Sequence, residues 1–198
     1  DQQDKYLSKL CAGDIKASFC LTEESGGTDI LQAMRTKARR VDNGWRLTGS
    51  KYWISGAMHA DLLIVLARTS EHRSRGVTMF LVDKPTPGVS ASEINTFAIN
   101  SYDTCSVAFD DVALSDDAVL GEVDQGFIQV LSTLNSERLN AAAVATGIGR
   151  GAQQLAVAGG HRRAQGVRRP RARPVFGGMV RREAEPEPAV VQVDARRR

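Results

Sequence analysis

The sequence predicts an α+β fold, in which an antiparallel β-sandwich or barrel-like domain is followed by a long helix. Between residues 13 and 118, about seven short strand-like stretches follow one another at close spacing, which is typical of antiparallel sandwiches and barrels. From Phe127 onward, apolar residues recur at intervals of three and four, which is the period of a helix. The chain is therefore expected to divide into a sheet domain and a helical segment.

The composition is that of an ordinary globular chain, with 198 residues, 42% hydrophobic and 25% charged. The longest apolar run, residues 62–67, is far too short to span a membrane. Three widely spaced cysteines (Cys11, Cys20 and Cys105) indicate buried thiols in a reducing compartment, and we expect neither disulfides nor a metal site. The polar start does not resemble a signal peptide and suggests that the sequence begins inside a longer protein.

The expected elements begin with a short amphipathic helix over residues 1–12. An Asn-Gly turn at residues 42–44 indicates a hairpin, because Asn and Gly tolerate the positive φ of a tight turn. Strands are expected at residues 15–21, 33–41, 45–55, 62–68, 77–82, 89–94 and 105–109. We expect a turn at residues 85–88, where two prolines and a glycine interrupt the apolar pattern.

The helix is expected to begin after Asp124, as N-cap, and to run to about residue 158, with a weak point near Gly147. Residues 1–158 carry a net charge of −4, whereas residues 159–198 hold eleven Arg and four acids, a net of +7. This tail has no helical period and is interpreted as a disordered basic segment. Nucleic-acid binding is disfavoured, because Phe176 is the one aromatic residue there for stacking on bases.

A glycine-rich turn follows the first expected strand, in the stretch Thr22-Glu23-Glu24-Ser25-Gly26-Gly27-Thr28-Asp29. Two consecutive glycines allow a tight turn and a close backbone approach to another group. Their amides, with the Thr28 hydroxyl, suit an anionic group such as a pyrophosphate. The alternative is a glycine turn that only reverses the chain.

Two further stretches carry residues that suit a cofactor or substrate. Trp53, Ile54 and Ser55 stand at a strand end, where Trp53 provides either a platform for a flat ring or part of the core. On the helix, Arg138 falls within the apolar stripe and Glu137 near its edge. Arg138 there calls for an anionic partner, and Glu137 is a candidate base, unless both are simply solvated.

These stretches, in this order, resemble the acyl-CoA dehydrogenase family. The flavin motif of that family stands here as residues 19–29, and its Trp-Ile-Thr/Ser motif as residues 53–55. A third signature stands as Phe109-Asp110-Asp111-Val112, Leu120-Gly121 and Gln125-Gly126-Phe127. The resemblance implies the end of an N-terminal helical domain over residues 1–12, a middle β-domain over 13–118, and the start of an incomplete C-terminal helical bundle over 119–158.

The resemblance implies FAD as cofactor, held on one face of the β-domain. Phe19, Leu21 and Thr22 would lie along the flavin, with Thr22 near its pyrimidine edge. Trp53, Ile54 and Ser55 would flank the ring, with Ser55 near N5. Gly27 and Thr28 would reach the pyrophosphate or the CoA part of the substrate.

The implied reaction is α,β-dehydrogenation of an acyl-CoA thioester, in which a Glu removes the α-proton and the β-hydride goes to flavin N5. Glu137 matches the base of the branches similar to isovaleryl- and long-chain acyl-CoA dehydrogenases. In most other branches, the base lies further along the chain. Asn135 and Arg138 match positions that meet the CoA moiety, as does Thr28.

The resemblance also implies an electron-transfer flavoprotein as electron acceptor, a dimer or tetramer, and a cytoplasmic location, or the mitochondrial matrix in a eukaryote. An acyl-CoA oxidase-like flavoenzyme and a non-catalytic β-module without bound FAD remain alternatives. Glu24 stands where the family has Pro. After Ala158 the expected helix gives way to the Arg-rich tail, for which we hypothesise a shifted reading frame.

Overall fold

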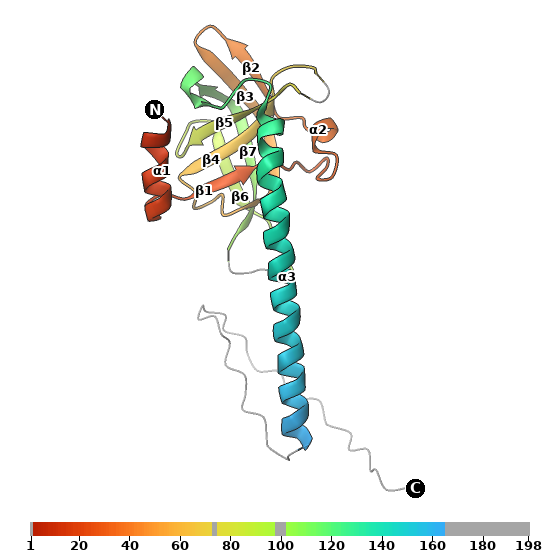
Figure 1. Ribbon diagram of the computed structural model, residues 1–198. Coiled ribbons are helices and arrows are strands. Elements are labelled where there is room, and N and C mark those ends of the chain that lie inside the picture. The colour runs from red at the N-terminus through yellow and green to blue at the C-terminus, as the bar shows by residue number, and fades with distance from the viewer. Residues whose placement is uncertain (1, 73–74, 98–101, 165–198) are drawn as a thin grey trace. The chain divides into compact units, whose positions relative to one another are not determined.

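The computed structural model describes residues 2–72, 75–97 and 102–164, with side chains described up to residue 158. Eight strands form one mixed sheet in the order β6-β7-β3-β2-β4-β5-β8, with β1 paired to β4 (Figure 1). The strands are β1 (Ala17–Cys20), β2 (Lys37–Val41), β3 (Gly44–Ser55), β4 (Leu62–Arg68), β5 (Val77–Asp83), β6 (Val89–Glu93), β7 (Thr104–Leu114) and β8 (Val119–Leu120). The expected sheet domain, followed by a long helix, is confirmed.

Most strand pairs are antiparallel, as expected, including the β2–β3 hairpin, in which Val41 pairs with Gly44 across the predicted Asn-Gly turn. Two pairings are parallel. β1 pairs with the first half of β4 through Ala17–Leu62 to Cys20–Val65, and β2 continues along the same edge through Lys37–Arg68. β4 therefore ties the two strands that flank the glycine-rich turn into one sheet.

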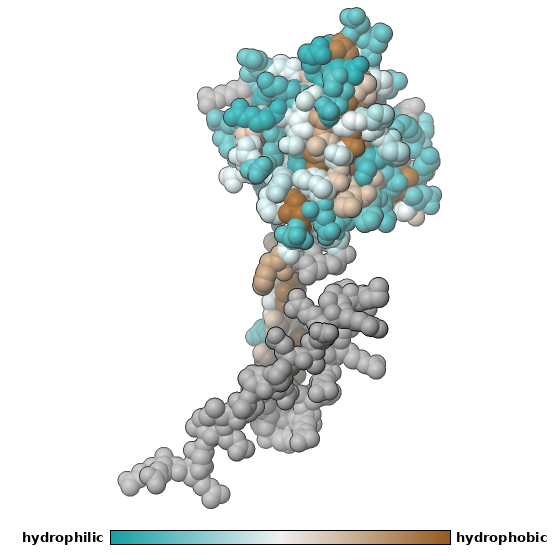
Figure 2. All heavy atoms as spheres, turned by 180° about the vertical axis from the view of Figure 1, so that it is seen from behind, coloured by the Kyte–Doolittle hydropathy of each residue, from teal (hydrophilic) through white to brown (hydrophobic). Residues whose placement is uncertain are grey.

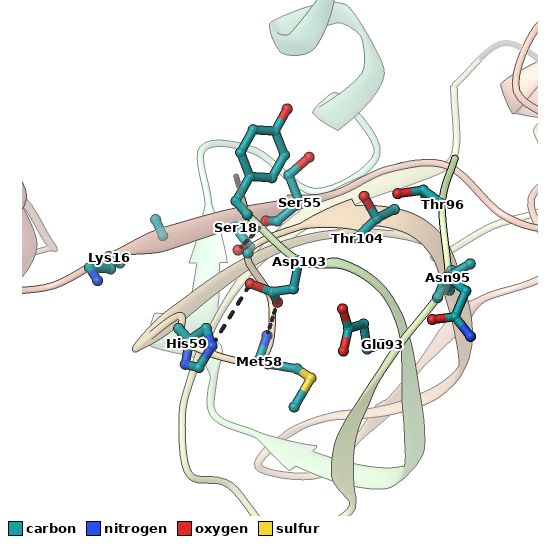
Figure 3. A pocket seen from close by; sticks show the side chains of 14 residues that line it. Lys16, Ser18, Ser55, Met58, His59, Glu93, Asn95, Thr96, Asp103 and Thr104 are labelled. Carbon is teal, nitrogen blue, oxygen red and sulfur yellow. Dashed lines mark hydrogen bonds and ion pairs between the residues drawn. The ribbon is translucent and has the colours of Figure 1, made fainter. Parts of the chain in front are cut away.

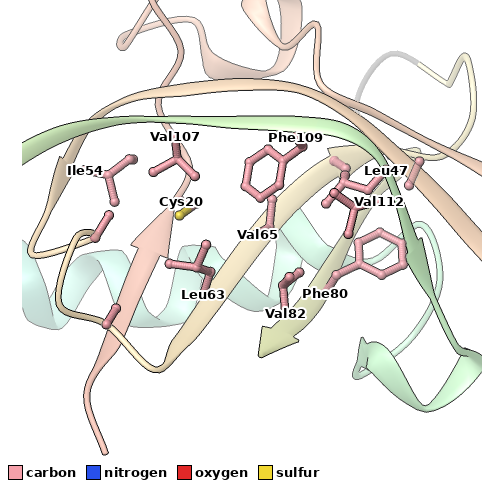
Figure 4. Close-up of a cluster of buried hydrophobic side chains, with 14 of the residues drawn as sticks. Cys20, Leu47, Ile54, Leu63, Val65, Phe80, Val82, Val107, Phe109 and Val112 are labelled. Carbon is pink, nitrogen blue, oxygen red and sulfur yellow. The ribbon is translucent and has the colours of Figure 1, made fainter. Parts of the chain in front are cut away.

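The main core lies on the inner face of the curved sheet (Figure 4). Phe109 of β7, Leu47 of β3, Val65 of β4 and Phe80 of β5 contribute to the same cluster, and each is at most 3% exposed. Because strands from both halves of the sheet contribute side chains to this core, the sheet curves around it. Seen from behind in Figure 2, the surface of the domain is mostly hydrophilic, with smaller apolar areas between the polar side chains.

A second apolar cluster explains why β4 and β5 are buried on both faces. Leu66, Val77 and Met79 point away from the main core and pack with Leu21 and Val130. Val130 belongs to α3 (Gly126–Ala164), whose first turns cover the outer face of these strands. The near-continuous apolar sequence of β4 and β5 follows from this two-sided burial.

Several predicted boundaries are wrong in detail. The strand expected from residue 33 begins at Lys37, because Ile30–Ala33 form the short helix α2, capped by the Asp29 carboxylate at 3.4 Å from Gln32 N. β7 extends to Leu114, and β8 was not expected. Asp124 does not cap α3: it has φ +63°, and its carboxylate accepts a hydrogen bond from Thr69.

The remaining helices are α1 (Gln2–Ala12), as predicted, and the 3-10 turn η1 (Asp116–Ala118). α3 passes Gly147 without a break and extends to Ala164, beyond the expected end at 158. The rest of the predicted basic tail, residues 165–198, lies outside the described residues. No helix within the described part of the chain is long and apolar enough to cross a membrane.

Candidate functional site

The ends of β1 and β3 are joined by two hydrogen bonds. Tyr52 N donates to Thr22 O at 2.9 Å, and the Ser18 hydroxyl donates to Ser55 O at 2.8 Å. Thr22 and Ser55 stand in the two motifs that the sequence analysis singled out. The fold therefore brings the ends of these motifs together.

Trp53 lies in a β-bulge. The pairing of β3 with β7 shifts between Lys51–Val107 and Ile54–Cys105, and Trp53 has φ +62°, in the left-handed region. A bulge redirects the side chain that it carries, and left-handed backbone is costly for a bulky residue. Trp53 is 56% exposed, with its ring edge-on to Tyr52 at 5.1 Å. This conformation presents a large aromatic ring to the surface.

The predicted flavin residues divide into an exposed and a buried set. Phe19 is 39% exposed, Ser55 is exposed and Thr22 is half-buried. Leu21 and Ile54, by contrast, are 7% and 2% exposed and pack in the two cores. The side chains of Leu21 and Ile54 are thus not placed to cover a ring, and a contact from either residue would come through its backbone.

The glycine-rich turn is fixed against α2. An added Cβ on Gly26 would lie 2.7 Å from Ala33 Cβ, so this close approach requires glycine. The Ser25 hydroxyl donates to Ala33 O at 2.8 Å. Gly27 and Thr28 are exposed beyond this contact, so their backbone and the Thr28 hydroxyl are open to a ligand.

A buried ion pair that the sequence analysis missed supports the turn. Lys51 Nζ lies 2.8 Å from Glu23 Oε1 and donates to Leu21 O at 3.1 Å. The two oxygens of Glu23 also accept from Arg35 N and Thr36 N, at 2.6 and 3.0 Å. Lys51 is an even number of residues from Trp45 and Leu47 on β3, so its side chain points to the same buried side of the strand. This alternation is the sequence signal that Lys51 is buried and requires a partner of opposite charge.

Electrostatics keep Glu23 charged. Burial by itself raises the pKa of a carboxyl group, but attraction to Lys51 and the hydrogen bonds from Lys51, Arg35 and Thr36 outweigh it. The pKa of Glu23 therefore falls below its usual value. The charged pair joins β1, β3 and the segment before β2 at one point.

A pocket of about 750 Å³ adjoins Ser55 (Figure 3). Its polar lining centres on Asp103, whose carboxylate accepts from Met58 N at 3.2 Å and lies 3.9 Å from His59 Nε2. The Cys105 thiol donates to Asp103 Oδ2 at 2.9 Å, and this hydrogen bond lowers the pKa of Asp103. No motif in the sequence indicates these residues. Within the described ranges, no three His, Cys, Asp or Glu residues form a metal site.

The candidate substrate residues lie on α3, one turn beyond its packed segment. Val130 is buried, and Leu134 packs against the cluster that contains Leu21. Glu137 and Arg138 follow Leu134 by three and four residues and so lie on the same side of the helix, where both are exposed. Arg138 Nη1 donates to Asn135 Oδ1 at 3.4 Å, so two of the predicted CoA contacts touch each other.

Comparisons with known sequences agree with this arrangement. The sequence profile of the acyl-CoA dehydrogenase middle domain matches residues 18–112. The mitochondrial 2-methylacyl-CoA dehydrogenase of Solanum tuberosum is 36% identical over 150 residues, which are 75% of this chain and 36% of that protein. The mitochondrial isovaleryl-CoA dehydrogenase of Pongo abelii is 34% identical over 142 residues, 70% of this chain and 33% of that protein.

Solved structures share the fold. Butyryl-CoA dehydrogenase from Megasphaera elsdenii superimposes with a TM-score of 0.69 and 33% identity, covering 72% of this chain and 38% of that one. A Mycobacterium smegmatis glutaryl-CoA dehydrogenase in complex with FADH2 has a TM-score of 0.62 and 36% identity, covering 68% of this chain and 33% of that one. The chain spans about a third of the length of the curated relatives it matches. By sequence and by fold, the chain belongs to the acyl-CoA dehydrogenase family.

Proposed function

We propose that this chain supplies the flavin-binding β-domain of an FAD-dependent acyl-CoA dehydrogenase, together with the start of its substrate-binding helix. The observation that carries the proposal is the pairing of the β1 and β3 ends beside Trp53. An exposed Trp in a left-handed bulge is a strained arrangement, and such strain concentrates at functional sites. Family membership and the FADH2 complex of the Mycobacterium smegmatis relative support this assignment.

The residues present fit a flat, partly anionic cofactor. The exposed rings of Phe19 and Trp53 offer apolar surface to a planar group, with the hydroxyls of Thr22 and Ser55 as hydrogen-bonding partners. The exposed backbone at Gly27 suits a phosphate, because backbone amides in a glycine-rich turn can bind an anion. FAD, when bound, supplies the two-electron acceptor for the hydride that leaves the substrate's β-carbon.

On the protein side, we assign Glu137 as the base that takes the α-proton on its carboxylate. The neighbouring thioester carbonyl makes the proton on the substrate's α-carbon acidic. Transfer of this proton requires that the substrate be held with the proton facing Glu137. Arg138 and Asn135 bind the CoA moiety beside the base. The 34% identity to isovaleryl-CoA dehydrogenase supports Glu137, because the resemblance to that branch of the family implies a base on this helix, just before an Arg.

Three further assignments belong to the same proposal. An electron-transfer flavoprotein is the electron acceptor, and the active assembly is a dimer or tetramer. The enzyme works in the mitochondrial matrix if the source is eukaryotic, which the mitochondrial relatives support.

The proposal is tested in a fusion protein, in which this chain is joined to those segments of a relative that it does not match. Turnover of acyl-CoA substrates is measured with an artificial electron acceptor, and bound flavin by absorbance. Glu137→Gln should lower turnover about 10²- to 10⁴-fold with flavin retained. The matched variant Glu122→Gln, at an exposed loop position, should have wild-type turnover. A colourless, inactive wild type would overturn the function, and an active Glu137→Gln would overturn only the assignment of the base.

A further inference from the structure

The end of β1 is held to β3 at three successive residues. Lys51 Nζ donates to Leu21 O at 3.1 Å, and Tyr52 N donates to Thr22 O at 2.9 Å. The carboxylate of Glu23 then lies 2.8 Å from the same Lys51 Nζ. We call these three contacts the clamp. Thr22, a residue of the flavin motif, stands in the middle of the clamp.

The clamp lies where β3 departs from its regular pairing. The register of β3 against β7 holds up to Lys51 and shifts before Ile54. Within this shift, Tyr52 N bonds to Thr22 O, and Trp53 adopts φ +62°. Trp53 therefore follows directly after the two β3 residues that hold the end of β1. A movement at the clamp would change the position of Trp53 relative to Thr22.

The contact around Glu23 requires a carboxylate. Its Oε1 accepts from Lys51 Nζ and Thr36 N, and its Oε2 accepts from Arg35 N. Both oxygens thus face hydrogen-bond donors. A glutamine has nearly the same shape, but its side-chain NH2 group would face a donor in either orientation. Removing the charge of Glu23 therefore breaks hydrogen bonds as well as the ion pair.

The clamp reaches the glycine-rich turn through Thr22 and Glu23. A Cβ placed on Gly27 would lie 3.6 Å from Thr22 Cγ2, so the methyl group of Thr22 is next to Gly27. Gly26 N donates to Glu23 O at 3.1 Å and closes the turn. The position of the amide at Gly27 therefore depends on the two residues that the clamp holds.

The clamp is buried, whereas the residues that it connects are open to the surface. Lys51 and Glu23 are almost inaccessible, so water screens their attraction little. Thr22 is half-buried, and Trp53 and Gly27 are more exposed. The open residues of the proposed flavin site are thus attached, through the backbone, to a buried charged pair.

We propose that the Lys51–Glu23 pair positions the two sides of the flavin site, by holding Thr22 and Gly27 at a fixed separation from Trp53. This inference rests on the proposed function for the identity of the ligand. Lys51 and Glu23 are positioning residues, because they act on the cofactor through Thr22 and Trp53. Loss of the pair weakens FAD binding even in molecules that remain folded.

The first test needs no flavin and uses the 198-residue chain. Hydrogen exchange followed by NMR measures the protection of the Tyr52 amide, which donates to Thr22 O. Glu23→Gln should lower this protection about tenfold relative to the amides between β4 and β5, since a hydrogen bond to a charged group contributes about that factor. Glu23→Asp, a milder variant that keeps the charge on a shorter side chain, should lower it less. Leu47→Ala, which removes side-chain volume from the main core, should leave the ratio unchanged.

The second test measures FAD affinity by fluorescence titration of the fusion protein, at a temperature where circular dichroism shows every variant folded. Glu23→Gln and Lys51→Met should each weaken FAD binding about tenfold. Two controls should keep wild-type affinity. Leu47→Ala destabilises the core away from the clamp, and Asp111→Asn removes an exposed ion pair with Arg46 on the same strand.

An unchanged protection ratio for the Tyr52 amide in both Glu23 variants would overturn the inference, as would wild-type FAD affinity in a folded Lys51→Met. An equal loss of affinity in Leu47→Ala would also overturn it, because the pair would then act only through stability. A wild-type fusion protein that binds no FAD, in combination with the expected loss of Tyr52 protection, would contradict the proposed function alone.

Discussion

Lys51 and Glu23 form a buried ion pair, 2.8 Å apart, that ties the middle of β3 to the first residues of the glycine-rich turn. Lys51 is 0% exposed, and Glu23 is 6% exposed. Through Leu21 O on one side and Arg35 N on the other, the pair holds the segments before and after the turn. It therefore positions Thr22, which stands between Leu21 and Glu23.

Removing one partner of this pair should strongly destabilise the domain. Glu23→Gln and Lys51→Met should each lower the free energy of unfolding by about 3–5 kcal/mol, because each leaves a buried charge unpaired. The double variant should lose clearly less than the sum of the two. Urea unfolding followed by circular dichroism measures all four proteins. Strict additivity of the two losses would show that the charges do not stabilise each other.

Acid should weaken the domain through Glu23. Because the pKa of Glu23 in the folded protein is below its ordinary value of 4.5, its stabilising effect is fully present above that pH. The effect is lost as the pH falls through the lower, folded pKa. The free energy of unfolding should thus fall on acidification, and less steeply in Glu23→Gln. Glu24→Gln, a change at the exposed neighbouring position, should follow the wild-type slope. Parallel curves for wild type and Glu23→Gln would contradict this prediction.

The two tryptophans should be spectroscopically distinct. Trp45 is 5% exposed and packs edge-on to Phe80, whereas Trp53 is 56% exposed. Trp53→Phe should therefore shift the emission to the blue and remove most quenching by acrylamide. If Trp53 contacts FAD, adding FAD should quench the wild type and leave Trp53→Phe nearly unchanged. Equal quenching of the two proteins by FAD would place the cofactor away from Trp53.

The start of α3 should not tolerate a larger residue at Gly126. An added Cβ there would lie 2.7 Å from Met79 N and 2.9 Å from Thr78 C, both backbone atoms of β5. Gly126→Ala should cost about 1–3 kcal/mol of unfolding free energy, because the helix start must shift. At Gly147 the same Cβ would meet nothing within 4 Å, so Gly147→Ala should favour the helix by up to about 1 kcal/mol. Equal urea midpoints for Gly126→Ala and wild type would contradict the close packing.

Much of the fold follows from local patterns in the sequence. The alternation along β3, the Asn-Gly hairpin and the helical period after Phe127 each depend on near neighbours in the chain, so they can be recognised without tertiary contacts. The short helix α2 was missed because an apolar run before Lys37 fits either a strand or a helix. Asp29, the residue that caps α2, was the local signal for the helix.

For the candidate site, the sequence by itself identified the glycine-rich turn, the Trp53 stretch and the Glu137-Arg138 pair through their motifs and spacing. Only the tertiary structure placed Thr22 against Tyr52, turned Trp53 outward in a bulge, and buried Leu21 and Ile54. The ion pair of Lys51 with Glu23 joins residues 28 positions apart. Such long-range pairings depend on strand register and packing, which residue spacing along the chain does not encode.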